Sequence, residues 1–243
     1  MPKSYGSPHV RKSFIFLLHL TLSLLVFSCT EHAAFERHVS EGVIEYEVTY
    51  PELDSNNIML EMLPNRMIMK FKDNKYKSEM KAAAGIVEMS VLADCNTKTM
   101  YNLVKIFSER YVLKMNQAEA LRMTDVLPPF QLEELDDTEI IAGARCKKVL
   151  LDFGAMKDES YIFAYTDEID IKDPNWCTPY RNIQGVLLDY RIENYNMNMR
   201  LRAIRITPEP IDDSEFVVDE RYLELNNDEF DKLVVRNMEM FME

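Results

Sequence analysis

The stretch RMIMKFKDNKYKSEMK, residues 66–81, decides the fold class of this chain. Its first half alternates, so that Met67, Met69 and Phe71 share one face of a strand while lysines share the other. The Asp-Asn pair at 73–74 has the chemistry of a hairpin turn, and the second half returns with the same alternation. The stretch therefore predicts two antiparallel strands with one apolar face and one wet face.

The same alternation recurs along most of the chain, between short turns. A short helix is expected at 116–123, where Asn116 and Glu119 are spaced as a capping box, and an amphipathic helix near the C-terminus begins at a second capping box, Asn226 and Glu229. These patterns predict a mainly β (α+β) domain without internal repeats. The expected strands are 42–50, 66–72, 75–81, 87–91, 97–104, 107–115, 139–141, 144–153, 160–166, 183–195 and 199–206.

The N-terminus has the pattern of a secretory signal. Its apolar run, 14–27, is shorter than the roughly 18–20 residues that cross a bilayer as a helix, and a basic segment without acids precedes it. The VFSC that ends at Cys29 resembles a bacterial lipobox; a simple cleaved signal peptide is the alternative. We expect a lipoprotein signal peptide over 1–28, lipid attachment at Cys29, a flexible tether over 29–41 and one folded domain over 42–243.

Lipid on Cys29 would hold the protein at a membrane of the bacterial cell envelope, and we expect the outer membrane, with the periplasmic or surface face left open. Nucleic acid is excluded as a partner by charge, since 41 acidic and 28 basic side chains give a net charge of −13. A protein partner stays unassigned.

The chemistry that the predicted domain lacks argues against catalysis. All four histidines precede it, so it has no Ser-His-Asp system and no His-ligated zinc, and its isolated glycines form no phosphate-binding loop. We therefore expect no enzyme activity, no catalytic residue, no cofactor and no metal site. The four histidines are His9, His19, His32 and His38.

Three cysteines remain in the domain if Cys29 is lipidated. If strand 144–153 pairs with 160–166, Cys146 comes near the loop that holds Cys177, so this pair is the candidate disulfide. Half-buried free thiols, with Cys95 among them, are the alternative.

The chain has 16 methionines, and they cluster on the predicted apolar faces. Methionine fills cores, but its unbranched thioether also repacks around ligands of different shape, so a plain core and a deformable cavity both stay open. The candidate residues for lining a hydrophobic ligand site are Met67, Met69, Phe71, Met80, Met89 and Met100.

Three further features have structural explanations that we prefer. The acidic segment 167–173 is expected to be a solvated loop rather than a calcium site, and Trp176 is expected to plug one end of the sheet rather than to form an exposed contact. Arg200, Arg202 and Arg205 are expected to face Asp189 and Glu193 of the preceding strand as a cross-strand charge ladder.

Six segments, spread over nearly the whole mature chain, are similar to a known group of sequences: LPNRMIMKFKDNKYKSEM (63–80), CNTKTMYNLV (95–104), IIAGARCKKVLL (140–151), YTDEIDIKDPNWCTPY (165–180), GVLLDYRIENYNMNMRLRAIRI (185–206) and IDDSEFVV (211–218). Together they resemble a family of uncharacterised lipoproteins from the Bacteroidota. The resemblance implies a fold like that of the LolA, LolB and LppX carriers. This is a strongly curved antiparallel half-barrel, with helices over a concave face that holds acyl chains. No binding residue is carried over from it.

Two functions are possible on these grounds, and both are hypotheses. The first is a non-enzymatic envelope lipoprotein that carries or binds a hydrophobic acyl or lipid ligand in its curved sheet. The second is a ligand-free interaction module that docks on another envelope protein through its acidic convex face.

Overall fold

The computed structural model describes residues 38–54, 56–124, 127–157, 160–194 and 197–242. The predicted signal peptide, Cys29 and the first part of the predicted tether lie outside these residues, so these assignments stay predictions. The described residues form one compact unit.

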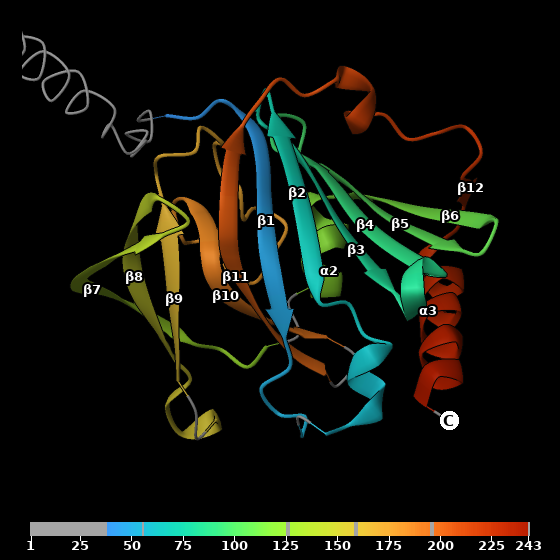
Figure 1. Ribbon diagram of the computed structural model, residues 1–243, viewed down its shortest axis with the longest axis horizontal. Helices are drawn as coiled ribbons and strands as arrows, with labels where there is room; N and C mark the ends of the chain where they lie inside the picture. Colours follow the sequence, from blue (N-terminus) through green and yellow to red (C-terminus); the bar gives the residue numbers. More distant parts are fainter. Residues whose placement is uncertain (1–37, 55, 125–126, 158–159, 195–196, 243) are drawn as a thin grey trace, which may run out of the picture. The chain divides into compact units, whose positions relative to one another are not determined.

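One 12-stranded sheet makes up most of this unit (Figure 1). The strands are β1 (Glu41–Thr49), β2 (Arg66–Lys72), β3 (Lys75–Ala82), β4 (Val87–Asp94), β5 (Thr99–Ile106), β6 (Glu109–Asn116), β7 (Gln131–Ile141), β8 (Ala144–Asp152), β9 (Tyr161–Thr166), β10 (Val186–Asn194), β11 (Met197–Pro208) and β12 (Leu223–Glu224). Their spatial order is β12-β6-β5-β4-β3-β2-β1-β11-β10-β9-β8-β7. The first and last strands of this order are not paired with each other, so the curved sheet stays open as a half-barrel.

The predicted fold class, a mainly β single curved sheet with few helices, is confirmed. Every strand pair is antiparallel except β12 with β6, which is parallel. This exception was not predicted, because β12 has only two residues and no alternation. Four single-turn helices, η1 (Ile58–Glu61), η2 (Ala83–Gly85), η3 (Gly154–Met156) and η4 (Asp213–Phe216), lie in the connections.

Both predicted α-helices form where their capping boxes place them. In α2 (Gln117–Thr124), the Asn116 amide donates to Glu119 Oε2 at 2.9 Å and the Glu119 amide donates to Asn116 Oδ1 at 3.1 Å. The same reciprocal pair, at 3.1 and 3.0 Å, begins α3 (Asn227–Met242). Each box satisfies two amides that the first helical turn leaves without partners.

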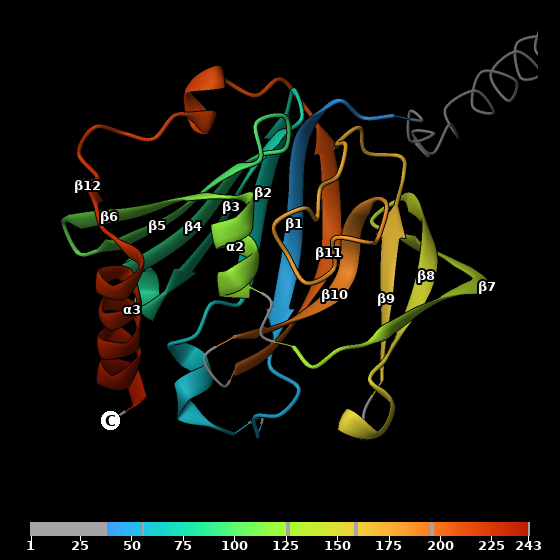
Figure 2. The same cartoon turned by 180° about the vertical axis from the view of Figure 1, so that it is seen from behind.

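Both α-helices and one long connection cover the same side of the sheet (Figure 2). Figure 2 shows α2 and the segment between β9 and β10 in front of β1, β2, β10 and β11, with α3 beside β6. We call this the concave side and the other the convex side. We call the segment from 167 to 185 the roof loop.

The strand register explains why the methionines gather on the concave side. Tyr46 of β1 pairs with Met67, Met67 with Met80, Met80 with Met89, and Met89 with Val104 of β5. Directly paired residues point to the same face, so these five side chains form one line across five strands. We call Met67, Met80 and Met89 the methionine row.

The half of the concave side nearest β8, β9 and β10 is filled by the protein itself. Phe163 packs edge-on against Tyr180 of the roof loop, with ring centroids 4.9 Å apart, and against Tyr190 at 6.4 Å. This half is therefore packed as a conventional core, whose edge at Tyr180 and Leu187 borders the other half. Its buried members are Val149, Leu151, Phe153, Tyr161, Phe163, Tyr165, Tyr180, Ile183 and Leu187.

On the convex side, the predicted charge ladder forms around a buried carboxylate. Asp189 is 6% exposed and accepts hydrogen bonds from Arg200 Nε at 2.9 Å and Arg200 Nη2 at 2.6 Å, and from Arg202. Arg205 pairs instead with Glu45 of β1. The prediction was wrong for Glu193, which pairs with Lys157 and turns toward the concave side.

Two boundaries also differ from the predictions. Val39 is 5% exposed and bridges to the roof loop: its amide donates to the Glu168 carbonyl at 2.8 Å, and its carbonyl accepts from the Asp170 amide at 2.9 Å. The end of the predicted tether is therefore part of the folded unit. In β7, the segment before residue 139 was not predicted, because its acidic run hides the alternation of an exposed edge strand.

Replacing Asp189 with Asn should lower the free energy of unfolding by about 1–3 kcal/mol, because hydrogen bonds from charged donors lose their ionised acceptor. Glu45→Gln is the matched control, since it removes one carboxylate from a more exposed pair and should change stability by less than about 1 kcal/mol. Urea unfolding at neutral pH measures both. Equal losses would show that Asp189 does not organise the convex side.

Candidate ligand cavity

A cavity of about 410 Å³ lies on the concave side, over the half that the aromatic core does not fill. Its volume falls within the range of about 300–1,000 Å³ typical of ligand sites. Side chains from β1 to β5, β10, β11, α2, α3 and the roof loop line it.

Methionine is the most frequent residue in this lining. Five of the six predicted lining residues are present, Met67, Met69, Met80, Met89 and Met100. The sixth, Phe71, is fully buried and is not part of the lining, which corrects that prediction. Four further methionines complete the set: Met62, Met123, Met197 and Met199.

Phe71 is excluded because the roof loop closes over its end of the sheet. Phe71 pairs with Tyr76, and the Tyr76 hydroxyl lies 3.3 Å from Cys177 Sγ of the roof loop. Trp176 beside it is 3% exposed, with Lys98 Nζ 5.7 Å from its ring centroid. Trp176 thus sits as a plug, as expected from the sequence.

The roof over the cavity is fixed by hydrogen bonds. Thr124 Oγ1, at the end of α2, lies 2.9 Å from the Cys177 carbonyl and 2.8 Å from the Ala120 carbonyl. Asn175 Nδ2 donates to the carbonyls of Ile183 and Gly185 at 2.8 and 2.9 Å. These bonds tie α2 to the roof loop and hold the loop in its folded shape, so the cavity has preformed walls.

The acidic part of the roof loop is anchored and not simply solvated. Ile169 and Ile171 are buried between its acids. Asp167 pairs with Lys147 at 2.9 Å and Asp173 with Lys98 at 3.1 Å. These carboxylates therefore serve ion pairs on the surface.

Among the lining residues that the structure describes, Glu193 carries the only charge. Its Oε1 accepts hydrogen bonds from Lys157 and from the Tyr161 hydroxyl, the latter at 2.6 Å. Burial alone would raise the pKa of Glu193. The hydrogen bonds from Lys157 and Tyr161 lower it by more than burial raises it, so the pKa lies below the usual range. Sequence reasoning missed this residue, because strict alternation along β10 assigns it to the convex side.

The other polar groups of the lining are neutral. The Tyr46 hydroxyl donates to the Leu187 carbonyl at 2.9 Å, and burial raises the pKa of Tyr46 well above the ordinary value. Asn102 donates to Met123 Sδ at 3.5 Å, whereas its buried Oδ1 has no partner among the described residues. An unpartnered buried oxygen is costly, so Asn102 marks a place where a bound molecule can donate a hydrogen bond.

The predicted disulfide is absent. Cys95, Cys146 and Cys177 are free and buried. Cys146 Sγ lies 3.6 Å from the Ala144 carbonyl of its own strand, whereas Cys177 contacts Tyr76 across the cavity floor. The pairing prediction failed because the roof loop runs across the sheet to β3, away from β8.

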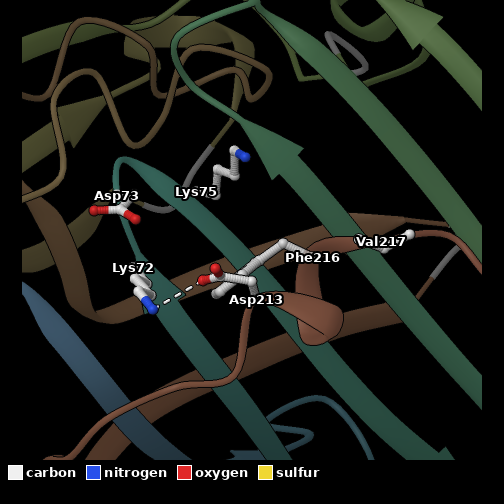
Figure 3. A pocket seen from close by; sticks show the side chains of 6 residues that line it. All are labelled: Lys72, Asp73, Lys75, Asp213, Phe216 and Val217. Carbon is white, nitrogen blue, oxygen red and sulfur yellow. Dashed lines mark ion pairs between the residues drawn. The ribbon is translucent and has the colours of Figure 1, made fainter.

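A second, shallow pocket of about 230 Å³ lies on the convex side between the β2–β3 turn and η4 (Figure 3). Its Lys72 is paired with Asp213 at 2.8 Å and with Glu41 at 3.7 Å. The pair with Asp213 attaches the segment after β11 to the sheet, so the pocket is explained by structural contacts.

No protein-family model matches the chain, and no curated protein matches it. Among solved structures, it is similar to a beta-barrel-like protein of the domain of unknown function DUF1849 from Brucella abortus, with 10% identity, a TM-score of 0.32, and coverage of 71% of this chain and 99% of that one. LprF from Mycobacterium bovis matches with 12% identity and a TM-score of 0.27, over 74% of this chain and 90% of LprF. The half-barrel fold therefore rests on the strand order and register of this chain.

Two further observations concern the described residues only. None of their helices combines the length and apolarity needed to cross a bilayer. No three of their histidine, cysteine, aspartate or glutamate side chains are grouped where they could hold a metal ion.

The cysteines should resist alkylation in the folded protein. Burial raises the pKa of Cys95 and of Cys146 to about 12, and it also raises the pKa of Cys177, so neutral pH leaves few thiolates. Iodoacetamide labelling mapped by peptide mass spectrometry should modify all three only after unfolding in urea. Rapid labelling of the native protein, or an oxidised Cys146–Cys177 peptide, would contradict this arrangement.

Proposed function

We propose that this protein is a lipid-anchored lipoprotein of the bacterial cell envelope that binds a hydrophobic ligand, such as an acyl chain, in the cavity on its concave side. The cavity carries this proposal. Its walls are preformed, largely apolar and rich in methionine, and these are the properties of a site that accepts flexible apolar molecules.

The methionine row gives the most direct support. Met67 is buried, but Met80 and Met89 are only partly buried although they point toward the interior of the half-barrel. Apolar side chains that stay accessible inside a cavity gain free energy when a ligand removes them from water, by about 25 cal/mol per Å². A bound apolar molecule therefore completes the burial that the protein leaves unfinished.

Binding fits this cavity better than catalysis. A general base works best with a pKa near the working pH, whereas hydrogen bonds from Lys157 and Tyr161 hold the pKa of Glu193 below its usual range. The alternative of a ligand-free interaction module has less support, because acids on the convex side, such as Asp189 and Glu45, are paired with arginines of β11.

Lipid attachment at Cys29 is part of the proposal and rests on the sequence. The lipobox-like VFSC supports it, as does the position of Val39, which begins the folded unit ten residues after Cys29. Ten extended residues reach about 35 Å, which is enough to hold the half-barrel just off a bilayer surface.

The test is to purify the full-length protein from bacterial membranes and analyse it by mass spectrometry. We expect the N-terminal peptide to carry acyl chains on Cys29 and the organic extract to contain an enriched apolar molecule. An unmodified Cys29 would contradict the anchoring, and an empty extract would contradict the binding.

A pair of variants makes this test specific to the cavity. Met80→Glu introduces a charge beside the apolar ligand and should reduce the extracted amount by roughly tenfold, since each 1.4 kcal/mol changes affinity tenfold. Ile204→Glu makes a similar change at a side chain of β11 that is 43% exposed, and should leave the extract unchanged. Equal losses in both variants would show that the extracted molecule does not occupy the cavity.

A further inference from the structure

One end of the cavity is polar, and it contains an acidic side chain but no basic one. Among the lining residues that the structure describes there is no lysine, arginine or histidine, and the single charged one is Glu193. A ligand head that enters this cavity therefore meets hydrogen-bond acceptors and no cation in the wall itself.

This polar end exists because β9 separates from β10. The two strands pair only from Val186 with Thr166 to Asp189 with Ala164, across a bulge. Beyond that point the Tyr180 hydroxyl donates to the Arg191 carbonyl at 2.8 Å. The Glu193 carboxylate meets the Tyr161 hydroxyl and the Lys157 ammonium where β9 and β10 are no longer paired. The sheet therefore opens where the carboxylate reaches the cavity.

The nearest cation, Lys157, is already engaged. Its ammonium pairs with Glu193 and lies 4.6 Å from the ring centroid of Tyr161 and 5.5 Å from that of Phe153. Arg191 lies nearby as well, with its guanidinium carbon 4.3 Å from the Tyr161 ring centroid. Both cations act on Glu193 and neither is among the residues that line the cavity.

Asn198 adds a second acceptor beside Glu193, since the two residues pair directly across β10 and β11. Its Nδ2 donates to Glu52 Oε1 at 2.8 Å and to the Tyr161 hydroxyl at 3.2 Å. Because a carboxylate only accepts, these bonds fix the orientation of the amide. Asn198 Oδ1 is then an acceptor, and it is buried without a partner among the described residues, in a side chain 7% exposed.

We propose that the bound ligand has a hydrogen-bond-donating head without negative charge, an alcohol or an amine, which lies at Glu193, with Asn198 behind it, while its chain extends toward the methionine row. This inference rests on the proposed function and adds the chemical class of the ligand. A hydroxyl or ammonium group can add a hydrogen bond to the Glu193 carboxylate, whereas a carboxylate would be desolvated beside another carboxylate.

The experiment compares three ligands that share one chain: hexadecanol, hexadecylamine and palmitic acid. Displacement of a fluorescent alkyl probe from the full-length protein at neutral pH measures their affinities, below the concentrations at which they self-associate. We expect the alcohol and the amine to bind at least about tenfold more tightly than the acid. Palmitic acid binding equally or more tightly would overturn the inference and leave the proposed function intact. Failure of all three to bind would contradict both.

Glu193→Gln tests the role of the carboxylate without changing its size. The substitution leaves Lys157 without its anionic partner, so the preference for hexadecylamine over palmitic acid should shrink by about tenfold. Glu133→Gln, in an exposed position of β7, changes the net charge equally and should leave the preference unchanged. An unchanged preference in Glu193→Gln would count against a ligand head group at Glu193. The order of the three affinities for the unaltered protein tests the proposal even if the variant does not fold.

Discussion

A sheet with a continuous apolar face must remove that face from water, and the architecture of this protein follows from how it does so. The register aligns Tyr46, Met67, Met80, Met89 and Val104 on one side of five strands. A closed barrel or a second sheet would cover such a face completely. Here the covering consists of one short helix, one long helix and a loop, and a cavity stays between them and part of the sheet.

The covering is uneven, and this unevenness produces the site. Near β8 and β9, aromatic side chains of the sheet and the roof loop interlock, as Phe163 and Tyr180 do. Over β2 to β5 the roof is held in place by Thr124 and Asn175 but does not fill the space beneath it. Methionine suits that half, because its flexible side chain can pack both when the cavity holds a ligand and when it does not. The same sheet thus has a rigid core in one half and a deformable cavity in the other.

The elements were predictable from the sequence where local rules decide. Alternation located most strands, and the spacing of Asn116 with Glu119 located α2 to within a residue. The failures come from long-range effects: Glu193 turns inward because the ladder between β9 and β10 opens, and Phe71 is sealed by a loop from a hundred residues away. Cys177 contacts Tyr76 rather than Cys146 because the roof loop crosses the sheet to β3. Periodicity predicts which face a residue occupies where the strand ladder stays regular, but it does not show which segment covers that face.

The central claim is that the space over the methionine row receives an apolar ligand. Methyl NMR of methionine-labelled protein, titrated with hexadecanol, tests it most directly because each methionine reports its own surroundings. If the ligand binds there, the methyl signals of Met67, Met80 and Met89 shift together at one saturable concentration. The signal of Met156, which is 67% exposed and outside the lining, stays in place. Signals of the row that do not move, or shifts spread equally over all methionines, would contradict it.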